Sequence, residues 1–223
     1  MLVAIALVLG CKRPGFLDSS NAGDANSAGA DSVVPAESDA GAAPSGDARA
    51  DVIRASRKFL DRESFSAKMV GQGKNPMQID LEYQAPDRFH MVHLGSGGTD
   101  IESIIIGRDM YMKQGTKWLK LTGSLGQTVP QIRQLFDEKG LESVTDVDYV
   151  GEETSGDQKL YKYSYRSEAR ENVPYPFKSR IWVRADDGLP KKVVIDYEDG
   201  DLMSLTIIYD YEKAVDIKPP ETK

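Results

Sequence analysis

The chain has 223 residues, 40% of them hydrophobic, with a formal net charge of −7 and a calculated isoelectric point near 5.0. This acidic balance excludes the basic surface expected of a nucleic-acid-binding protein, and it gives no electrostatic reason for the chain to lie on an anionic membrane. The single cysteine, Cys11, excludes a disulfide within the chain.

Residues 1–10, MLVAIALVLG, are uncharged and almost all aliphatic. They are too few to span a bilayer as a helix, which takes about 20 residues, but their length is typical of the apolar part of a secretion signal. The basic segment that normally precedes such a signal is missing, so we expect the natural start of the chain to lie further upstream.

Cys11 follows Val8-Leu9-Gly10, an order that resembles the lipobox of bacterial lipoproteins, in which the cysteine is acylated and becomes the new N-terminus. The alternative is a buried or intermolecularly bonded cysteine, but the residues that follow cannot build a core. Stable anchoring takes more than one acyl chain, since each buried methylene contributes about 0.8 kcal/mol. A triacylated N-terminus would meet that requirement.

Residues 11–48 contain the lipidated cysteine and then a segment rich in Ala, Gly, Ser, Asp, Asn and Pro. Such a segment buries too little apolar surface to offset its ordering entropy, so it is predicted to be a disordered tether. A flexible chain of this length spans on the order of 30 Å, enough to hold a domain clear of a membrane.

A folded domain is predicted for residues 49–223. It begins with an amphipathic helix at about 49–62, where Val52, Ala55 and Phe59 follow helical spacing and Asp47 or Asp51 could cap the N-terminus. A second short helix is expected at 128–139. Thr128 and Gln131 have the form of a capping box there, and Gly140 follows the last residue.

The rest of the domain follows the period of two that is typical of half-buried antiparallel strands, most clearly in residues 77–84 and 203–212. Turn signals at Asp187-Gly188, Asp199-Gly200 and Gln114-Gly115-Thr116 predict hairpins, hence a meander in which neighbouring strands pair. Nine further runs read as strands, which makes about eleven: 64–72, 88–94, 100–107, 110–114, 117–121, 144–153, 159–167, 178–185 and 191–197.

Both faces of the central strands are apolar, because Ile104, Ile105 and Ile106 are consecutive, as are Met110, Tyr111 and Met112. One face would pack in the core, and the other needs a helix or a ligand over it. The fold class is therefore α+β, a curved antiparallel sheet with short amphipathic helices across its hollow face.

Residues suited to covalent chemistry are few. His90 and His93, the only histidines, would point to opposite faces of a strand, so no metal pair is expected, and the acidic pairs at 186–187 and 198–199 read as turn formers. No nucleophile elbow or nucleotide-binding fingerprint is present. We expect no enzyme, cofactor or metal. A hydrolase would need a convergent polar site beside an apolar tunnel.

The methionines favour an apolar cavity, since their flexible thioethers accept varied shapes, although packing in the core explains any single one of them equally well. The residues that we expect to contact an apolar ligand are Phe89, Met91, Ile105, Met110, Met112, Trp118, Leu135, Phe136, Trp182, Met203, Leu205 and Ile207.

Three groups of residues resemble the LolA-like carriers and the LppX/LprG branch of mycobacterial lipoproteins. They are Tyr83-Gln84-Ala85-Pro86-Asp87-Arg88-Phe89, then Ile105-Ile106-Gly107 with Tyr111 and Trp118, then Asp187 to Val193 with Tyr209-Asp210-Tyr211 and Ile217 to Pro220. The resemblance implies an unclosed half-barrel of about eleven strands whose hollow holds acyl chains. Because the LolA carrier is not lipidated, the chain is closer to the anchored receptor LolB or to LppX.

The first hypothesis is a lipid-anchored envelope protein that binds the acyl chain of a lipid or lipoprotein for carriage or handover, with the 128–139 helix as a hinge. The alternative is a non-enzymatic sensor or assembly module that binds another envelope protein through an exposed patch or a sheet edge. Lys12 stands where an Asp signals inner-membrane retention in many Gram-negative bacteria, so the resemblance favours the outer membrane, facing the periplasm.

Overall fold

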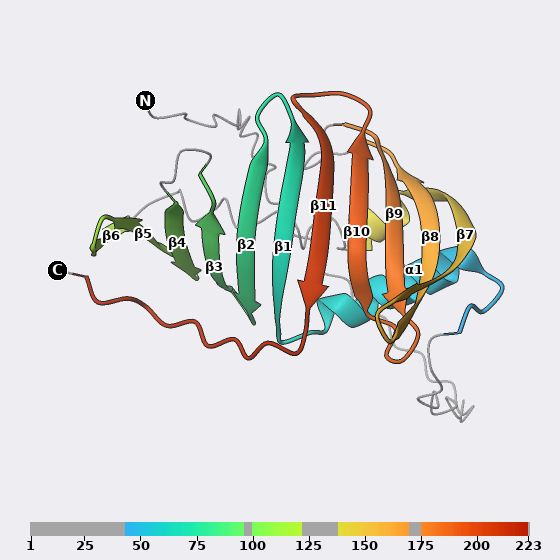
Figure 1. Cartoon of the computed structure of the whole chain (residues 1–223), viewed down its shortest axis with the longest axis horizontal. Helices are drawn as coiled ribbons and strands as arrows, with labels where there is room; N and C mark the ends of the chain where they lie inside the picture. The colour runs from blue at the N-terminus through green and yellow to red at the C-terminus, as the bar shows by residue number, and fades with distance from the viewer. Residues whose placement is uncertain (1–42, 96–99, 122–137, 170–174, 223) are drawn as a thin grey trace, which may run out of the picture. The chain divides into compact units, whose positions relative to one another are not determined.

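The alternating apolar residues of the sequence form the strands of one antiparallel sheet (Figure 1). The computed structural model describes residues 43–95, 100–121, 138–169 and 175–222, and these all belong to the second of two units of the chain, Asp39–Lys223. The elements are α1 (Ala48–Leu60), β1 (Ser64–Gly73), β2 (Met77–Gln84), β3 (Arg88–His93), β4 (Ile101–Ile106), β5 (Asp109–Gln114), β6 (Lys117–Leu121), α2 (Glu138–Glu142), β7 (Val144–Ser155), β8 (Gln158–Ser167), β9 (Phe177–Arg184), β10 (Pro190–Tyr197) and β11 (Leu202–Asp210).

The sheet consists of two meanders that meet in its middle. Its strand order is β6-β5-β4-β3-β2-β1-β11-β10-β9-β8-β7, so the first and last strands are neighbours, with Ala67 of β1 opposite Tyr209 of β11. Because β6 and β7 are the two edges, the sheet is unclosed, which confirms the predicted half-barrel of about eleven strands. The meander prediction holds within each half, and the β1–β11 pair joins the halves.

The helix α1 lies against the concave face of the sheet, where it contacts β7 and β10 (Figure 1). Asp47 caps it by accepting a 3.0 Å hydrogen bond from the backbone N–H of Ala50, as one of the two predicted caps would. The predicted apolar residues Val52, Ala55 and Phe59 are buried beneath it. The helix ends at Leu60, two residues before the predicted end.

Aromatic rings form the centre of the core between α1 and the sheet. The ring of Phe59 lies 5.0 Å from those of Phe65 and Tyr209, and Phe65 lies 5.2 Å from Tyr83. Tilted ring pairs at such distances contribute about 0.5–1.5 kcal/mol each beyond the area they bury. The core therefore ties the helix to the junction of the two meanders.

Two of the predicted turns are longer than two residues. Asp187-Gly188 lies in the loop 185–189 and Asp199-Gly200 in the loop 198–201, whereas β5 and β6 are joined by Gly115-Thr116 alone. Side chains shape the longer loops, since Asp187 accepts a 3.0 Å hydrogen bond from the N–H of Leu189. Gly188 has a φ of 73°, a conformation that favours glycine.

The expected helix at 128–139 is only partly covered, because residues 128–137 lie outside the described residues. The described helix α2, Glu138–Glu142, includes Gly140, so the prediction that a helix ends before Gly140 is wrong. Leu141 is buried, and its burial outweighs the modest cost of a glycine within a helix.

Residues 211–222, which we call the C-terminal strap, run from β11 past the ends of β2–β6 (Figure 1). Ile217 is buried, its N–H donates to Oε1 of Gln84 at 2.9 Å, and its carbonyl accepts from Arg88 at 2.8 Å. Thr222 then forms a parallel bridge with Trp118 on β6. The strap thus fastens the outer strands to one another.

Candidate functional site

The register of β2–β6 aligns apolar side chains in rows across the concave face, since cross-strand partners point to the same side of a sheet. One row contains Tyr83, Phe89, Ile105, Met110 and Leu121. The next row contains Leu81, Met91, Ser103, Met112 and Leu119. The predicted residues Phe89, Met91, Ile105, Met110 and Met112 therefore share one face of three adjoining strands, β3–β5.

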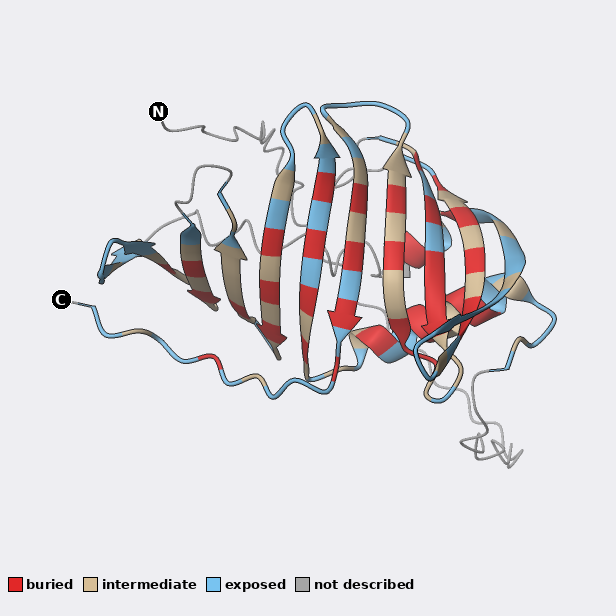
Figure 2. Cartoon of the chain, in the orientation of Figure 1, coloured by how far each residue is buried: buried red, intermediate tan, exposed pale blue. Residues whose placement is uncertain are grey.

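Burial falls along these rows from the middle of the sheet towards β6 (Figure 2). Phe89 and Ile105 are fully packed, but Ile101 on β4 is 50% exposed and Leu119 on β6 is 43% exposed. We call the partly covered set the outer apolar surface, and its members are Met91, Ile101, Met110, Met112, Leu119 and Leu121.

Two other predicted residues, Leu205 and Ile207, also point to the concave face but belong to the filled core. They lie on β11 opposite Gly71 and Met69, and both are buried. They support the floor under α1 and do not join the outer apolar surface.

The two tryptophans do not lie on the concave face of the sheet, because the register places both on the opposite, convex face. Trp182 is opposite Lys162 and Lys192, whose ammonium groups lie 4.9 and 4.7 Å from its ring centroid, and its indole N–H donates to Glu153 at 2.6 Å. Trp118 is opposite Lys113. Cation–π contacts and a carboxylate acceptor satisfy these rings on the charged face.

Met203 also departs from its prediction. It is 68% exposed, because the register between β1 and β11 shifts at Gln72 and Gly73 and the regular alternation of β11 begins only beyond that point. Leu135, Phe136 and Cys11 lie outside the described residues.

The histidines point to opposite faces, as predicted. His90 lies on the convex face between Glu82 and Glu102, with contacts of 2.9 and 3.0 Å, and His93 is on the concave side. The pKa of both glutamates is lowered. Burial alone would raise it, but hydrogen bonds from His90 and from a lysine, Lys213 at Glu82 and Lys113 at Glu102, outweigh that effect. Within the described residues, no group of His, Cys, Asp and Glu could hold a metal ion.

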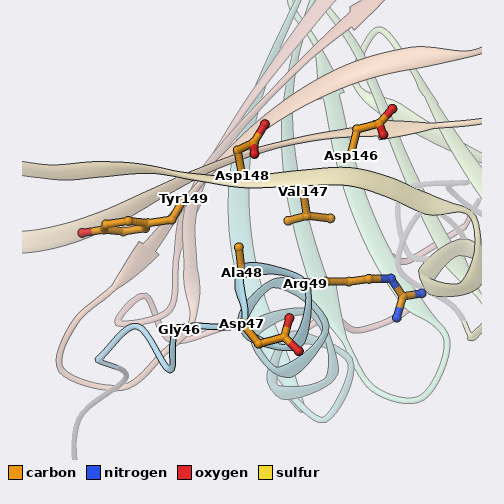
Figure 3. Close-up of a pocket in the computed structure, with 8 residues that line it drawn as sticks. All are labelled: Gly46, Asp47, Ala48, Arg49, Asp146, Val147, Asp148 and Tyr149. Carbon is orange, nitrogen blue, oxygen red and sulfur yellow. The ribbon is translucent and has the colours of Figure 1, made fainter.

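A second feature, which the sequence analysis missed, is an open hollow of about 710 Å³ between the N-terminus of α1 and β7 (Figure 3). It is lined by Gly46, Asp47, Ala48, Arg49, Asp146, Val147, Asp148 and Tyr149. Figure 3 shows Val147 pointing towards Ala48, whereas Asp146 and Asp148 point to the other side of the strand. The carboxylates therefore do not converge within the hollow.

Neither helix in the described part of the chain is long and apolar enough to cross a membrane.

The geometry is similar to that of two solved mycobacterial proteins. The lipoprotein LppX of Mycobacterium tuberculosis matches with a TM-score of 0.62 and 15% identity over 78% of this chain and 100% of its own. LprF of Mycobacterium bovis matches with a TM-score of 0.57 and 15% identity over 79% of this chain and 98% of its own. The chain has an LppX-like fold.

A LolA superfamily protein from Nitrosomonas europaea also matches, with a TM-score of 0.35 and 12% identity over 77% of this chain and 94% of its own. The matches to LppX and LprF confirm the predicted LppX/LprG-like fold. The sequence itself matches no family model and no curated protein.

Proposed function

We propose that this LppX-like chain is a lipid-anchored protein of the bacterial cell envelope. It binds the acyl chain of a lipid or lipoprotein on its concave face, for carriage or handover and without covalent chemistry. The observation that carries the proposal is the outer apolar surface, a set of partly covered apolar side chains on the concave face of β3–β6. The convex face differs, because the charged cluster of Glu82, His90 and Glu102 lies there beside Ile104 and the buried Tyr111.

The chemistry of the outer apolar surface suits a flexible hydrocarbon chain. Three of its six members are methionines, whose unbranched thioethers adapt to different apolar shapes. Each methylene that leaves water for such a surface contributes about 0.8 kcal/mol, so a few covered methylenes supply useful affinity without any hydrogen bond. Selectivity would then depend on chain length more than on the polar head group.

The anchor in this proposal is Cys11, with residues 11–48 as the tether and the outer membrane as the site of attachment. LppX is itself described as a lipoprotein, and this supports an envelope location for a chain of the same fold. The lipobox-like order Val8-Leu9-Gly10-Cys11 is the feature of this sequence that supports the anchor.

The test is native mass spectrometry with lipid extraction on the unit 39–223, expressed without its anchor, which retains the capping residue Asp47. We expect a co-purifying acylated species at about one per chain, because the apolar surface is contiguous. A chain that stays free of lipid, and takes up none when phospholipid is added, would contradict the proposal.

Matched variants locate the bound lipid. Ile101→Ser with Leu119→Ser removes the two most exposed members of the outer apolar surface, and we expect lipid occupancy to fall about tenfold. The control is Val70→Ser with Ile208→Ser on the convex face, where the side chains are similarly exposed at 40% and 45%. Equal loss in both pairs would place the lipid elsewhere.

A second candidate function is that of a non-enzymatic sensor or assembly module that binds another envelope protein. The free edge of β7 favours it, because that strand has a hydrogen-bonded strand neighbour on one side only within the described residues. Failure to take up lipid would favour this function over carriage.

A further inference from the structure

The two edges of the sheet are finished differently. At the β6 edge, Thr222 of the C-terminal strap forms a bridge with Trp118. At the other edge, the twelve-residue strand β7 pairs with β8, and no described segment pairs with its outer side. Arg49 covers only its first residue, by donating to the carbonyl of Val144 at 3.3 Å. A long open edge is a ready template for another strand.

The middle of β7 also exposes apolar side chains. Tyr149 is 41% exposed and Val150 is 52% exposed. Val150 has no partner on β8, because the register shifts between Tyr149 and Gly151. Val147 points towards Ala48 across the hollow (Figure 3). Val147 and Tyr149 therefore give one side of the open edge an apolar character, and Val150 adds an exposed apolar side chain at the register shift.

Two of the four charged residues that line the hollow, Asp47 and Arg49, are already satisfied by hydrogen bonds. Asp47 caps α1 through Ala50, and the guanidinium of Arg49 donates to the carbonyls of Val144 and Leu141. The hollow is thus able to receive an uncharged side chain beside Ala48 and Val147 without leaving a buried charge unpaired.

The other side of the edge carries free negative charge. Further along β7, Glu152 and Glu153 form ion pairs with Lys159 and Lys162 of β8. Asp146 and Asp148 are exposed and form no ion pair with any described residue. Both point away from the hollow in Figure 3. They form an acidic row along the open edge.

We infer that β7 is the docking edge for an extended segment of another protein in which lysine or arginine alternates with apolar residues. The segment adds a twelfth strand to the sheet through backbone hydrogen bonds. Its basic side chains lie beside Asp146 and Asp148, and its apolar side chains lie over Val147 and the hollow. A second copy of this chain is a poorer partner, because pairing β7 with itself would bring the same acids together.

This inference does not rest on acyl-chain binding. The docking edge and the outer apolar surface lie at opposite ends of the strand order, and no residue belongs to both. A chain that binds no lipid would leave the docking edge intact, so the two experiments fail independently.

The test uses the full 223-residue chain and two fluorescent octapeptides, KVKVKVKV and EVEVEVEV, followed by anisotropy. We expect the lysine peptide to bind at least about tenfold more tightly than the glutamate peptide, with the difference shrinking as salt screens the acidic row. Equal binding of both peptides would overturn the inference.

The acidic row is tested by Asp146→Asn with Asp148→Asn, for which we expect about tenfold weaker binding of the lysine peptide. The control is Asp157→Asn with Glu221→Gln, which removes the same charge from exposed sites outside the acidic row, on the β7–β8 turn and the C-terminal strap, and should leave affinity unchanged. If the acidic-row variant and the control variant bind the lysine peptide with equal affinity, the inference is overturned.

The backbone edge is tested by Val150→Pro, since proline cannot donate to an added strand and Val150 has no partner on β8 to lose. We expect binding to weaken about tenfold while the circular dichroism spectrum stays the same. Unchanged binding would show that no strand is added. A dimer of the unaltered chain that is lost in Val150→Pro would identify a second copy as the occupant and overturn the basic segment.

Discussion

The two halves of the sheet carry apolar side chains on the same face but use them differently. Under α1, the concave side chains of β1 and β8–β11 are closed into a core in which Phe59 and Tyr209 are fully buried. On β4–β6, Ile101 and Leu119 remain about half exposed at equivalent positions of the ladder. The difference teaches that a period of two indicates which residues share a face, but only a covering element makes that face a core.

Side-chain type changes between the halves as well. The closed half uses rings and β-branched residues, which are stiff and fix one packing arrangement, such as Tyr209, Ile207 and Val193. The outer half uses Met91, Met110 and Met112, which have three rotatable bonds each. A stiff core therefore adjoins an adaptable surface within one sheet.

The largest expected difference between the two halves is in the unfolding free energy lost by Phe59→Ala and by Met112→Ala. Phe59 is fully buried between two rings, so we expect the variant to lose about 3–5 kcal/mol of unfolding free energy. Met112 is partly covered, so its loss should be about 1 kcal/mol. Urea denaturation followed by circular dichroism measures both. Similar losses would mean that the outer half is also a closed core.

A second test separates the halves through the C-terminal strap. Ile217→Ala removes a buried contact next to Gln84 and Arg88, and we expect a loss of about 2 kcal/mol that is confined to the outer strands. Hydrogen exchange should speed up in β5 and β6 and stay unchanged in β8 and β9. The control is Ile208→Ala, which removes a half-exposed side chain of β11. Uniform acceleration across the sheet would contradict a local role for the strap.

The smallest expected effect is electrostatic and belongs to the outer half. Burial opposes a lower pKa at Glu82 and Glu102, but hydrogen bonds from Lys213, Lys113 and His90 outweigh it and hold both below 4.5. Their stabilising contribution is therefore present above about pH 4.5 and is lost as pH falls through the lower folded pKa.

Solvent screening limits that contribution to about 1 kcal/mol or less, because both carboxylates are partly exposed. Glu82→Gln with Glu102→Gln should flatten the fall in unfolding free energy between about pH 5 and pH 3, measured by urea denaturation. Asp157→Asn, on the exposed β7–β8 turn, should leave the slope as it is. If the double variant has the same slope as the unaltered chain, Glu82 and Glu102 do not contribute to the pH dependence of the unfolding free energy.

The sequence was sufficient for the strands and for α1. Alternation in residues 77–84 and 203–209 reports half-burial directly, and the spacing of Val52, Ala55 and Phe59 reports a helix that packs on a sheet. The pairing of β1 with β11 was not predicted, because nothing local in either strand specifies a partner at the far end of the chain. The loops 185–189 and 198–201 were mistaken for tighter turns because Asp-Gly fits both.

Alternation in the sequence indicates which residues share a face of the sheet, but it does not indicate which residues make up the candidate site. The structure places Phe89, Met91 and Met110 on one face of the sheet, which alternation with polar residues indicates for Phe89 and Met91 but not for Met110, and their contact with a ligand stays a prediction. Trp182 was misplaced because a large ring next to lysines is stable on either face, through cation–π contact on one and burial on the other. The β7 edge was missed because an open edge is a property of pairing, which no single strand reveals.

The adjacency of β1 and β11 has a consequence for how the chain acquires its structure. Each meander consists of hairpins that close over short stretches of sequence, so both can form early. The rings of Phe59 and Phe65, however, wait for Tyr209, which is made near the end of synthesis. Closing that long loop is the slow, entropically costly step. The ring cluster of Phe59, Phe65 and Tyr209 is therefore complete only once the last strand pairs with the first.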